Sequence, residues 1–219
     1  MSGALLIGAG GLGVAVALAL AGTSLRRLGV VDPDVVSLSN LQRQVLYRVS
    51  DLDQPKVACV VRHLRSRRPE LEVVAHRARL EDAVAIAALA RDYDLIVDGS
   101  DNFPTRFAAN DAALLGGKVL VHGAATGFRG QVMSIVPKRS ACLRCLFGGP
   151  PEVAGPTCRT QGVLGSLVGE MGWLMALEAA RWLRGERGVL VDRLLTVDVL
   201  AGQRRQVVLR RQEDCPGCG

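Results

Sequence analysis

Short apolar runs alternate with segments of helical spacing through the first half of the chain. The apolar runs predict five strands, at residues 4–7, 28–31, 71–75, 95–97 and 119–121. The segments between them predict helices at residues 12–21, 56–67 and 81–90, and one that ends near residue 115. Strands that alternate with helices predict an α/β fold with a parallel sheet and right-handed crossovers.

The pattern changes after Gly123. A strand at residues 131–136 is followed by a cysteine-rich turn, a loop rich in glycine and proline, and a long helix at residues 163–183. Two further strands, at residues 194–199 and 206–209, have no helix between them. The sequence therefore predicts one domain over residues 1–219, in which the C-terminal strands join the same sheet in antiparallel pairing.

Composition narrows the class of protein. Hydrophobic residues make up 49% of the 219 residues and charged residues 22%, which excludes a disordered chain. The net charge is +6, but aromatic residues make up only 4%, so a base-stacking platform for nucleic acid is not expected. The uncharged stretch at residues 4–22 is broken by glycines and lacks a basic leader. We therefore expect no membrane span, no signal peptide and a soluble cytoplasmic protein.

A glycine-rich loop follows the first predicted strand. Gly8, Gly10 and Gly13 match G-x-G-x-x-G, where glycine permits a tight turn, backbone approach to a phosphate, and close packing of helix on strand. Asp32 ends the second strand, the position of a carboxylate that holds ribose hydroxyls. The loop thus indicates a bound nucleotide, most often a nicotinamide or flavin cofactor. A glycine-rich turn without a ligand is the alternative.

The residues after the second strand favour a nucleoside triphosphate. Arg43 and Lys56 can reach back over the glycine loop, where two cations suit a triphosphate better than a pyrophosphate. Asp98 and Asp101 follow the fourth strand, where a carboxylate can hold Mg²⁺. Taken singly, the cations fit solvated surface residues, and Asp101 with Asn102 fits a helix cap. Their shared place at one sheet edge favours ATP.

Four of the six cysteines form two C-x-x-C pairs. Cys142 with Cys145 and Cys215 with Cys218 together provide four thiolates, which predicts a closed zinc site. A closed site leaves no open coordination position, so this zinc is expected to be structural and to fasten the C-terminal tail to the domain. Unrelated cysteines or a redox pair are the alternative.

Two cysteines stand outside these pairs. Cys158 is followed by an arginine and precedes the long helix, and both features favour a reactive thiolate; a buried packing cysteine is the alternative. Cys59 lies in an apolar helical segment and is expected in the core. The histidines, His63, His76 and His122, have no spacing typical of metal ligands or a catalytic triad, so we assign them no role.

Together these motifs resemble the ThiF/MoeB/HesA family, the bacterial relatives of ubiquitin-activating enzymes. The resemblance rests on the glycine loop, residues 37–44 (SLSNLQRQ), 54–56 (QPK), 100–102 (SDN) and 158–160 (CRT), and both cysteine pairs. It implies a Rossmann-like, mostly parallel sheet with helices on both faces, antiparallel C-terminal strands and a zinc staple. It also implies an enzyme that uses ATP and Mg²⁺ to adenylate the C-terminal glycine of a small ubiquitin-fold sulfur carrier protein, with release of pyrophosphate.

The resemblance assigns roles to individual residues. It places Asp32 on the ribose and Asp101 on Mg²⁺, and it makes Arg43, Lys56, Asp101 and Cys158 the expected catalytic residues. It divides the domain into a nucleotide-binding half, residues 1–125, and a half for carrier and zinc, residues 126–219. The full nucleotide site implied in this way comprises Gly8, Gly10, Gly11, Gly13, Asp32, Asn40, Arg43, Gln44, Lys56, Asp101 and Asn102.

The resemblance also bears on pathway and partners. The stretch around Cys158 and the Cys-Pro-Gly-Cys ending resemble the thiamine branch, which has a ThiS-like carrier. There, the cysteine that matches Cys158 can become linked to the carrier thiocarboxylate. A MoaD-like carrier for molybdopterin synthesis is the alternative. A sulfur donor protein and a second copy of the chain, as a homodimer, are the other expected partners.

Two different functional classes stay open at this point. Family members usually carry an N-terminal segment whose arginine reaches the ATP phosphates of the partner subunit, whereas the first strand here begins almost at Met1. A non-catalytic protein that binds nucleotide and carrier is therefore one alternative. A nicotinamide-dependent oxidoreductase is the other, and it would bind NAD(H) at least as well as ATP.

Overall fold

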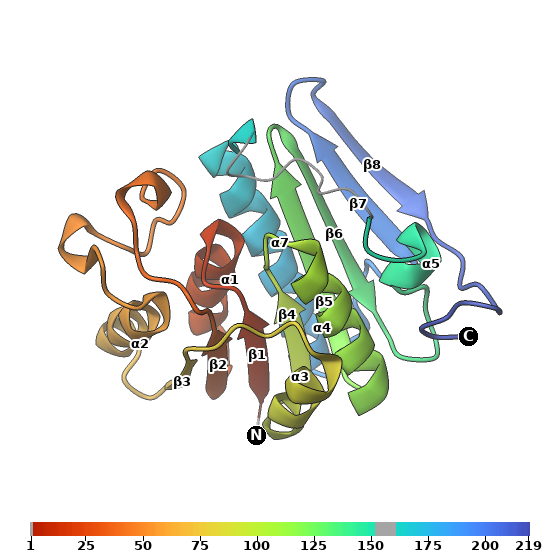
Figure 1. Ribbon diagram of the computed structural model, residues 1–219, viewed down its shortest axis with the longest axis horizontal. Helices are drawn as coiled ribbons and strands as arrows, with labels where there is room; N and C mark the ends of the chain where they lie inside the picture. Colours follow the sequence, from red (N-terminus) through yellow and green to blue (C-terminus); the bar gives the residue numbers. More distant parts are fainter. Residues whose placement is uncertain (1, 152–160) are drawn as a thin grey trace.

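An eight-stranded sheet forms the centre of the computed structural model, which describes residues 2–151 and 161–219 (Figure 1). The strands lie in the order β3-β2-β1-β4-β5-β6-β7-β8. The first five pair in parallel, and the last three join in antiparallel pairing, as predicted. The strands are β1 (Gly3–Ile7), β2 (Arg27–Val31), β3 (Glu72–His76), β4 (Leu95–Asp98), β5 (Val119–Thr126), β6 (Arg129–Ile135), β7 (Arg193–Asp198) and β8 (Gln203–Val208).

Helices cover both faces of this sheet (Figure 1). α1, α2 and α7 pack into the apolar core on one face, and α3 and α4 pack into the core on the other. This arrangement confirms the expected Rossmann-like class. The helices are α1 (Gly11–Ala21), α2 (Lys56–Arg67), α3 (Ala83–Leu89), α4 (Phe103–Gly116), α5 (Leu143–Phe147) and α7 (Gly165–Leu183), with 3₁₀ turns at Leu38–Asn40, Val49–Asp51 and Ala90–Asp92.

The central strands are buried on both sides, which explains their uninterrupted apolar sequence. Leu5 and Leu6 of β1 are both fully buried, yet they belong to the cores on opposite faces. Successive side chains of a strand point to opposite faces, so a strand covered on both sides needs apolar residues at every position. Cys59 is fully buried in the first of these cores, as expected.

Two elements differ in length from the sequence prediction. The helix predicted from residue 81 begins at Ala83, because the Asp82 carboxylate accepts a hydrogen bond from the Ala85 N–H at 2.7 Å and caps the helix. The strand predicted at residues 119–121 continues to Thr126. Its parallel pairing with β4 ends at His122, but its antiparallel pairing with β6 continues to the Thr126–Arg129 pair.

α7 contains a buried carboxylate that the apolar pattern conceals. Glu178 is 2% exposed and accepts hydrogen bonds from the Ser134 hydroxyl at 2.9 Å and from the Val189 and Leu190 N–H groups at 3.1 Å. The carboxylate thus joins α7 to β6 and to the segment before β7.

Across residues 2–151 and 161–219, no helix is long and apolar enough to cross a membrane.

α7 also packs tightly against α1 at small residues. A Cβ atom on Gly172 would lie 2.5 Å from the Ala15 Cβ, and one on Gly11 would lie 2.5 Å from the Val168 Cγ1. Glycine at these positions therefore lets the two helices approach closely. This contact fixes the N-terminal end of α1, where the glycine loop enters the helix.

Candidate functional site

The loops that follow β1, β2 and β4 meet at the carboxyl edge of the sheet. The Gly8 N–H donates to the Val31 carbonyl at 2.8 Å, and the Gly99 N–H donates to the Ile7 carbonyl at 2.9 Å. The first bond ties the glycine loop to the end of β2, and the second ties it to the loop after β4. In an open α/β sheet, ligands bind outside these carboxyl ends. The structure thus brings three motifs that are far apart in sequence into one place.

The glycines of the loop have different structural roles. Gly8 has a φ of +94°, and a Cβ there would lie 2.8 Å from the Gly99 carbonyl oxygen. A Cβ on Gly13 would lie 1.9 Å from the Gly8 carbonyl oxygen, so only glycine lets α1 lie this close to β1. A Cβ on Gly10 would meet only the Gln44 Nε2, at 3.8 Å. The Gly10 backbone therefore has free space in front of it, which fits the approach of a phosphate.

Asp32 lies beside the glycine loop and is only 6% exposed. Its Oδ2 accepts a hydrogen bond from the Ala9 N–H at 2.7 Å, and its Oδ1 accepts one from the Asp34 N–H at 2.9 Å. Burial raises the pKa of Asp32 above its ordinary value, while Lys56 and the two backbone donors oppose that rise. A buried carboxylate with a shifted pKa, beside a glycine loop of the phosphate-binding type, is typical of a functional site.

Lys56 begins α2 and lies against the carboxylates that end β2. Its ammonium is 3.0 Å from the Asp34 Oδ2 and 3.8 Å from the Asp32 Oδ1. The residue is only 5% exposed, which excludes the alternative of a solvated surface lysine. The Lys56 N–H also donates to the Asp34 carbonyl at 3.0 Å, which holds the start of α2 against the end of β2, where two carboxylates satisfy the charge of the side chain.

Arg43 lies at the same edge, next to the start of α1. A Cβ on Gly11 would lie 3.4 Å from the Arg43 carbonyl oxygen and 3.5 Å from its Cγ. The Arg43 Nη1 donates to the Ser39 carbonyl at 3.2 Å. Asn40 caps the same turn through its backbone, since its carbonyl accepts from the Gln44 N–H at 3.0 Å. Arg43, which was predicted to contact the phosphates, therefore lies beside the glycine loop.

The loop after β4 brings Asp101 and Asn102 to this edge. Asp101 is exposed, which suits a carboxylate that holds a hydrated Mg²⁺. The Asn102 Oδ1 accepts a hydrogen bond from the Thr105 N–H at 2.9 Å and caps α4. The helix-cap interpretation therefore holds for Asn102, whose side-chain oxygen is engaged by the helix, and not for Asp101.

Two polar atoms at the edge of the glycine loop are buried without a hydrogen-bond partner. They are the Gln44 Oε1 and the Ser100 Oγ. Their residues are 3% and 6% exposed, respectively. Buried polar atoms are rarely left unpaired, so a site that ligates polar groups explains them better than packing does. These two residues therefore fit a bound nucleotide, whose hydroxyl and amino groups can donate hydrogen bonds to the two buried atoms.

Sequence reasoning missed His122 and Arg106, which lie beside the loop after β4. It named Asp98 together with Asp101 as a carboxylate for Mg²⁺, whereas Asp98 is fully buried and engaged by His122. The Nδ1 of His122, to which no role was assigned, lies 2.8 Å from the Asp98 Oδ2, and the carboxylate accepts this hydrogen bond. Arg106 donates from Nε and Nη2 to the Ser100 carbonyl at 3.4 and 3.3 Å. Asp98 and His122 are 24 positions apart. Only the pairing of β4 with β5, in which they are register partners, brings them together.

The four paired cysteines form one cluster between α5 and the C-terminal tail. Their sulfur atoms all lie within 4.8 Å of one another. The Sγ–Sγ distance is 3.9 Å for Cys142–Cys145, 3.7 Å for Cys142–Cys215 and 3.4 Å for Cys145–Cys218. A tetrahedral zinc with Zn–S bonds of about 2.3 Å requires sulfur atoms roughly 3.8 Å apart. The donor set and spacing therefore fit the predicted structural zinc.

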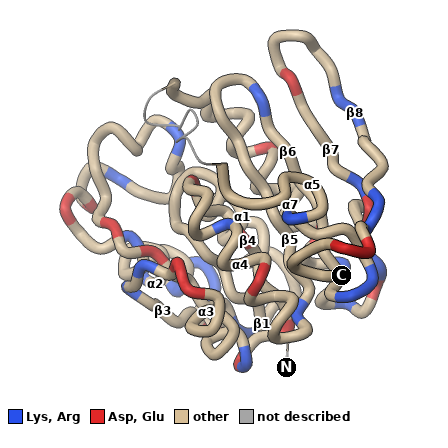
Figure 2. The backbone as a smooth tube through the Cα atoms, turned by 45° about the vertical axis from the view of Figure 1, so that its right-hand side comes forward, with Lys and Arg blue, Asp and Glu red and all other residues tan. Residues whose placement is uncertain are grey.

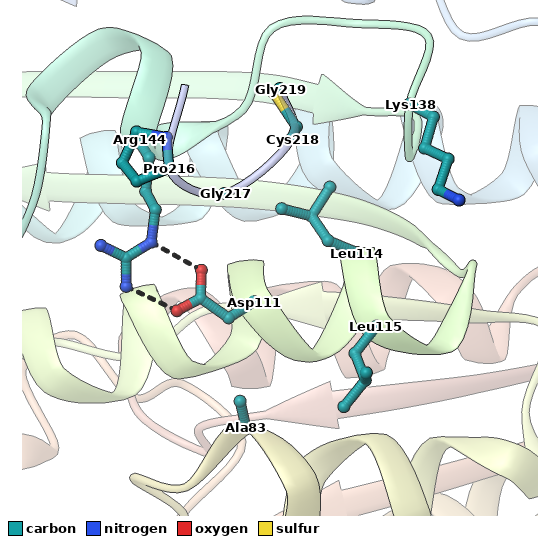
Figure 3. Close-up of a pocket in the computed structure, with 10 residues that line it drawn as sticks. All are labelled: Ala83, Asp111, Leu114, Leu115, Lys138, Arg144, Pro216, Gly217, Cys218 and Gly219. Carbon is teal, nitrogen blue, oxygen red and sulfur yellow. Dashed lines mark hydrogen bonds and ion pairs between the residues drawn. The ribbon is translucent and has the colours of Figure 1, made fainter. Parts of the chain in front are cut away.

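This cysteine cluster is attached to α4 by a separate ion pair. Arg144 of α5 donates from Nε and Nη2 to the two carboxylate oxygens of Asp111, at 2.8 and 2.6 Å (Figure 3). The Leu143 N–H donates to the Asn110 Oδ1 at 2.9 Å. A hollow of about 430 Å³ lies between α4 and the tail, lined in part by Arg144 and Gly217. This hollow borders the cysteine cluster and does not include the glycine loop.

Cys158 and its neighbours Arg159 and Thr160 lie outside the described residues. The described residues resume at Gln161, and Gly162 and Leu164 lie next to the turn between β5 and β6. There the Gly127 N–H donates to the Gly162 carbonyl at 3.0 Å, and the Leu164 N–H donates to the Gly127 carbonyl at 3.0 Å. A Cβ on Gly165 would lie 2.9 Å from the Gln42 carbonyl oxygen. The start of α7 therefore packs on the loop that carries Arg43.

Comparison with known proteins finds relatives that match nearly the whole chain. The model of the ThiF family matches residues 1–217. The chain is 44% identical to the sulfur carrier protein adenylyltransferase of Thermus thermophilus, over 97% of this chain and 80% of that protein. It is 41% identical to the SAMP-activating enzyme E1 of Haloferax volcanii, over 97% of this chain and 78% of that protein. It is also 41% identical to the adenylyltransferase and sulfurtransferase MOCS3-1 of Zea mays, but covers only 47% of that protein.

Solved structures show the same fold at low sequence identity. The Escherichia coli protein MccB, crystallised with ATP, superimposes with a TM-score of 0.87 at 17% identity, over 100% of this chain and 67% of MccB. The protein PaaA superimposes with a TM-score of 0.77 at 18% identity, over 97% of this chain and 65% of PaaA. These structures support the arrangement of sheet and helices and not a particular substrate.

Proposed function

The chain belongs to the ThiF family and is a nucleotidyltransferase, and we propose that it adenylates the C-terminal glycine of a small ubiquitin-fold sulfur carrier protein with ATP. One observation carries the proposal: the glycine loop, Asp32 and the unpartnered atoms of Gln44 and Ser100 lie together at the carboxyl edge of the sheet. The names of its relatives, which include a sulfur carrier protein adenylyltransferase, support the carrier as the second substrate.

The reaction needs positioning and charge stabilisation more than proton transfer. The carrier carboxylate, already ionised at neutral pH, attacks the α-phosphorus of ATP, and the bond to pyrophosphate breaks. The glycine-loop N–H groups, Arg43 and Lys56 would stabilise the charge on the phosphates. A divalent cation held by Asp101 would neutralise part of that charge. Asp32 would hold the ribose, and so fix the α-phosphorus in line for attack.

We assign docking of the carrier to the half of the chain formed by residues 126–219. All six residues of β8 are exposed, and β8 is the last strand of the sheet. Arg205 gives this edge a positive charge, whereas Arg204 is paired with Glu170 of α7 at 2.6 Å. Figure 2 shows basic positions on β8. Val207 and Val208 add exposed apolar surface. Such an edge suits a partner whose surface is acidic and apolar. The homodimer and the sulfur donor protein implied by the resemblance stay predictions.

Carrier-stimulated exchange of pyrophosphate into ATP is the direct test. Purified carriers that end in Gly-Gly, one ThiS-like and one MoaD-like, are added in parallel to the protein with ATP, Mg²⁺ and labelled pyrophosphate. We expect exchange only with a carrier, and faster exchange with the ThiS-like carrier. Faster exchange with the MoaD-like carrier would move the assignment to molybdopterin synthesis. Binding of ATP and carrier without exchange would support the non-catalytic alternative, and NAD(H) that binds more tightly than ATP would support the oxidoreductase.

Cys158 is proposed to act after adenylation. Cys158→Ser should retain carrier-stimulated exchange and lose the covalent carrier adduct measured by intact mass, because thiol chemistry is not needed to form the acyl-adenylate. Cys59→Ala is the matched control: it removes a fully buried cysteine outside the zinc cluster and should retain the adduct. Collapse of exchange in a folded Cys158→Ser protein would show that the cysteine takes part in adenylation itself.

A further inference from the structure

A buried histidine–aspartate pair lies directly behind the loop that carries Asp101. The His122 Nδ1 is 2.8 Å from the Asp98 Oδ2, and the two side chains are 1% and 0% exposed. Burial raises the pKa of Asp98, but the hydrogen bond from His122 and the nearby Arg106 charge outweigh it, so that the pKa lies below its ordinary value. The carboxylate is thus ionised at the end of β4, inside the protein.

The second oxygen of Asp98 holds the loop itself. The Asp98 Oδ1 accepts a hydrogen bond from the Ser100 N–H at 3.0 Å. The Ser100 carbonyl accepts from the Arg106 guanidinium at 3.3 and 3.4 Å. Both polar groups of the Ser100 backbone are therefore fixed, one from β4 and one from α4. Asp101 is the next residue, so its exposed carboxylate extends from a backbone that these hydrogen bonds hold in place.

We propose that His122 is a positioning residue: through Asp98 and Ser100 it orients Asp101 toward the divalent cation that accompanies ATP. His122 prevents the Asp98 carboxylate from turning away from the Ser100 N–H, because a hydrogen bond at Oδ2 fixes the plane of the group. The inference rests on the proposed function, in which Asp101 holds this cation. It adds a residue of β5 that does not touch the nucleotide loops.

A second pair of the same kind provides a matched control. The His63 Nε2 is 2.7 Å from the Asp51 Oδ2, and the two side chains are 10% and 3% exposed. This pair joins α2 to the turn at Val49–Asp51 and contacts no residue of the loop after β4. Loss of either pair removes a buried hydrogen bond to a carboxylate, so both changes should lower thermal stability. Only loss of the His122–Asp98 bond should change how Mg²⁺ affects ATP binding.

The test compares ATP binding with and without Mg²⁺ by calorimetry, which requires no turnover. The readout is the ratio of the dissociation constant measured with EDTA to that measured with Mg²⁺. In His122→Ala this ratio should fall about tenfold, the effect expected when a hydrogen bond to a charged group is lost. His122→Asn should recover most of the ratio, since its amide nitrogen can take the place of Nδ1. His63→Gln should keep the wild-type ratio.

The outcomes separate this proposal from the proposed function. An unchanged ratio in folded His122→Ala, an equal fall in His63→Gln, or no effect of Mg²⁺ on ATP binding to the wild-type protein would overturn the positioning role. If the ratio responds as expected but the wild-type protein shows no carrier-stimulated exchange, the adenylation of a carrier fails and the positioning role stands. If the wild-type protein shows carrier-stimulated exchange but the ratio is unchanged in His122→Ala, the adenylation of a carrier stands and the positioning role fails.

Discussion

Cys145→Ser and Cys218→Ser should each lose the bound zinc and lower the melting temperature by about 10 °C or more. The reason lies in how the tail is held. Leu209, Cys215 and Cys218 are at most 9% exposed and belong to the core on the α4 face. Four sulfur atoms within 4.8 Å of one another repel as thiolates unless a cation joins them. Without the metal, the tail loses its link to Cys142 and Cys145 and keeps only its apolar burial and the hydrogen bonds described for it, such as the Arg211 bonds to the Cys218 carbonyl and the Leu209 N–H bond to the Asp192 carbonyl.

Metal analysis and thermal unfolding of the same samples check this prediction. The wild-type protein should contain one zinc per chain and each serine variant close to none. Cys59→Ala controls for the loss of a buried sulfur, because Cys59 is fully buried but lies outside the cluster. It should lower the melting temperature and keep the zinc. Freshly purified wild-type protein without zinc would refute the site, and a serine variant that keeps its zinc would show that three thiolates suffice.

The cysteine cluster and the glycine loop could be predicted from sequence because each depends on local spacing. A C-x-x-C pair places two thiolates on one turn, and the only long-range assumption was that the two pairs meet; their sulfur atoms do. The glycine loop likewise depends on three positions within one turn. At Gly8 and Gly13, a Cβ atom would clash with backbone atoms, so no residue other than glycine fits at these positions.

The network behind the site could not be predicted, because it depends on strand register. Asp98 and His122 become neighbours only through the pairing of β4 with β5, and nothing in the sequence near His122 indicates a partner. The burial of Lys56 has the same origin. Its position after Gln54 and Pro55 predicts a cation near the nucleotide, but not that two carboxylates at the end of β2 enclose it. Sequence motifs thus predicted which residues lie at the candidate site, and the fold determines which residues pack behind them.

Lys56→Ala should reduce carrier-stimulated pyrophosphate exchange by on the order of 10²–10³, the usual effect of removing one preorganised charge from an active site. The ammonium lies 3.8 Å from the Asp32 Oδ1 and opposes the rise in the pKa of Asp32 that burial causes. Its removal should therefore raise that pKa further. Exchange depends on ionised Asp32 and is lost as pH falls through this pKa, so the acidic limb of the pH profile should move to higher pH in the variant.

Two companion variants isolate the role of this charge. Asp34→Asn removes the closest partner of Lys56, at 3.0 Å, but leaves the ammonium beside Asp32, so it should retain at least about a tenth of wild-type exchange. Asp101→Ala should flatten the dependence of exchange on Mg²⁺, whereas Lys56→Ala should leave a slower rate that still depends on Mg²⁺. Exchange is measured across titrations of Mg²⁺ and of pH, with circular dichroism to confirm folding. An Asp34→Asn variant as slow as Lys56→Ala would mean that the ion pair supports the fold around α2 and not the phosphates. Near-normal exchange in folded Asp101→Ala would remove the cation from that carboxylate, and with it much of the argument for ATP at this edge of the sheet.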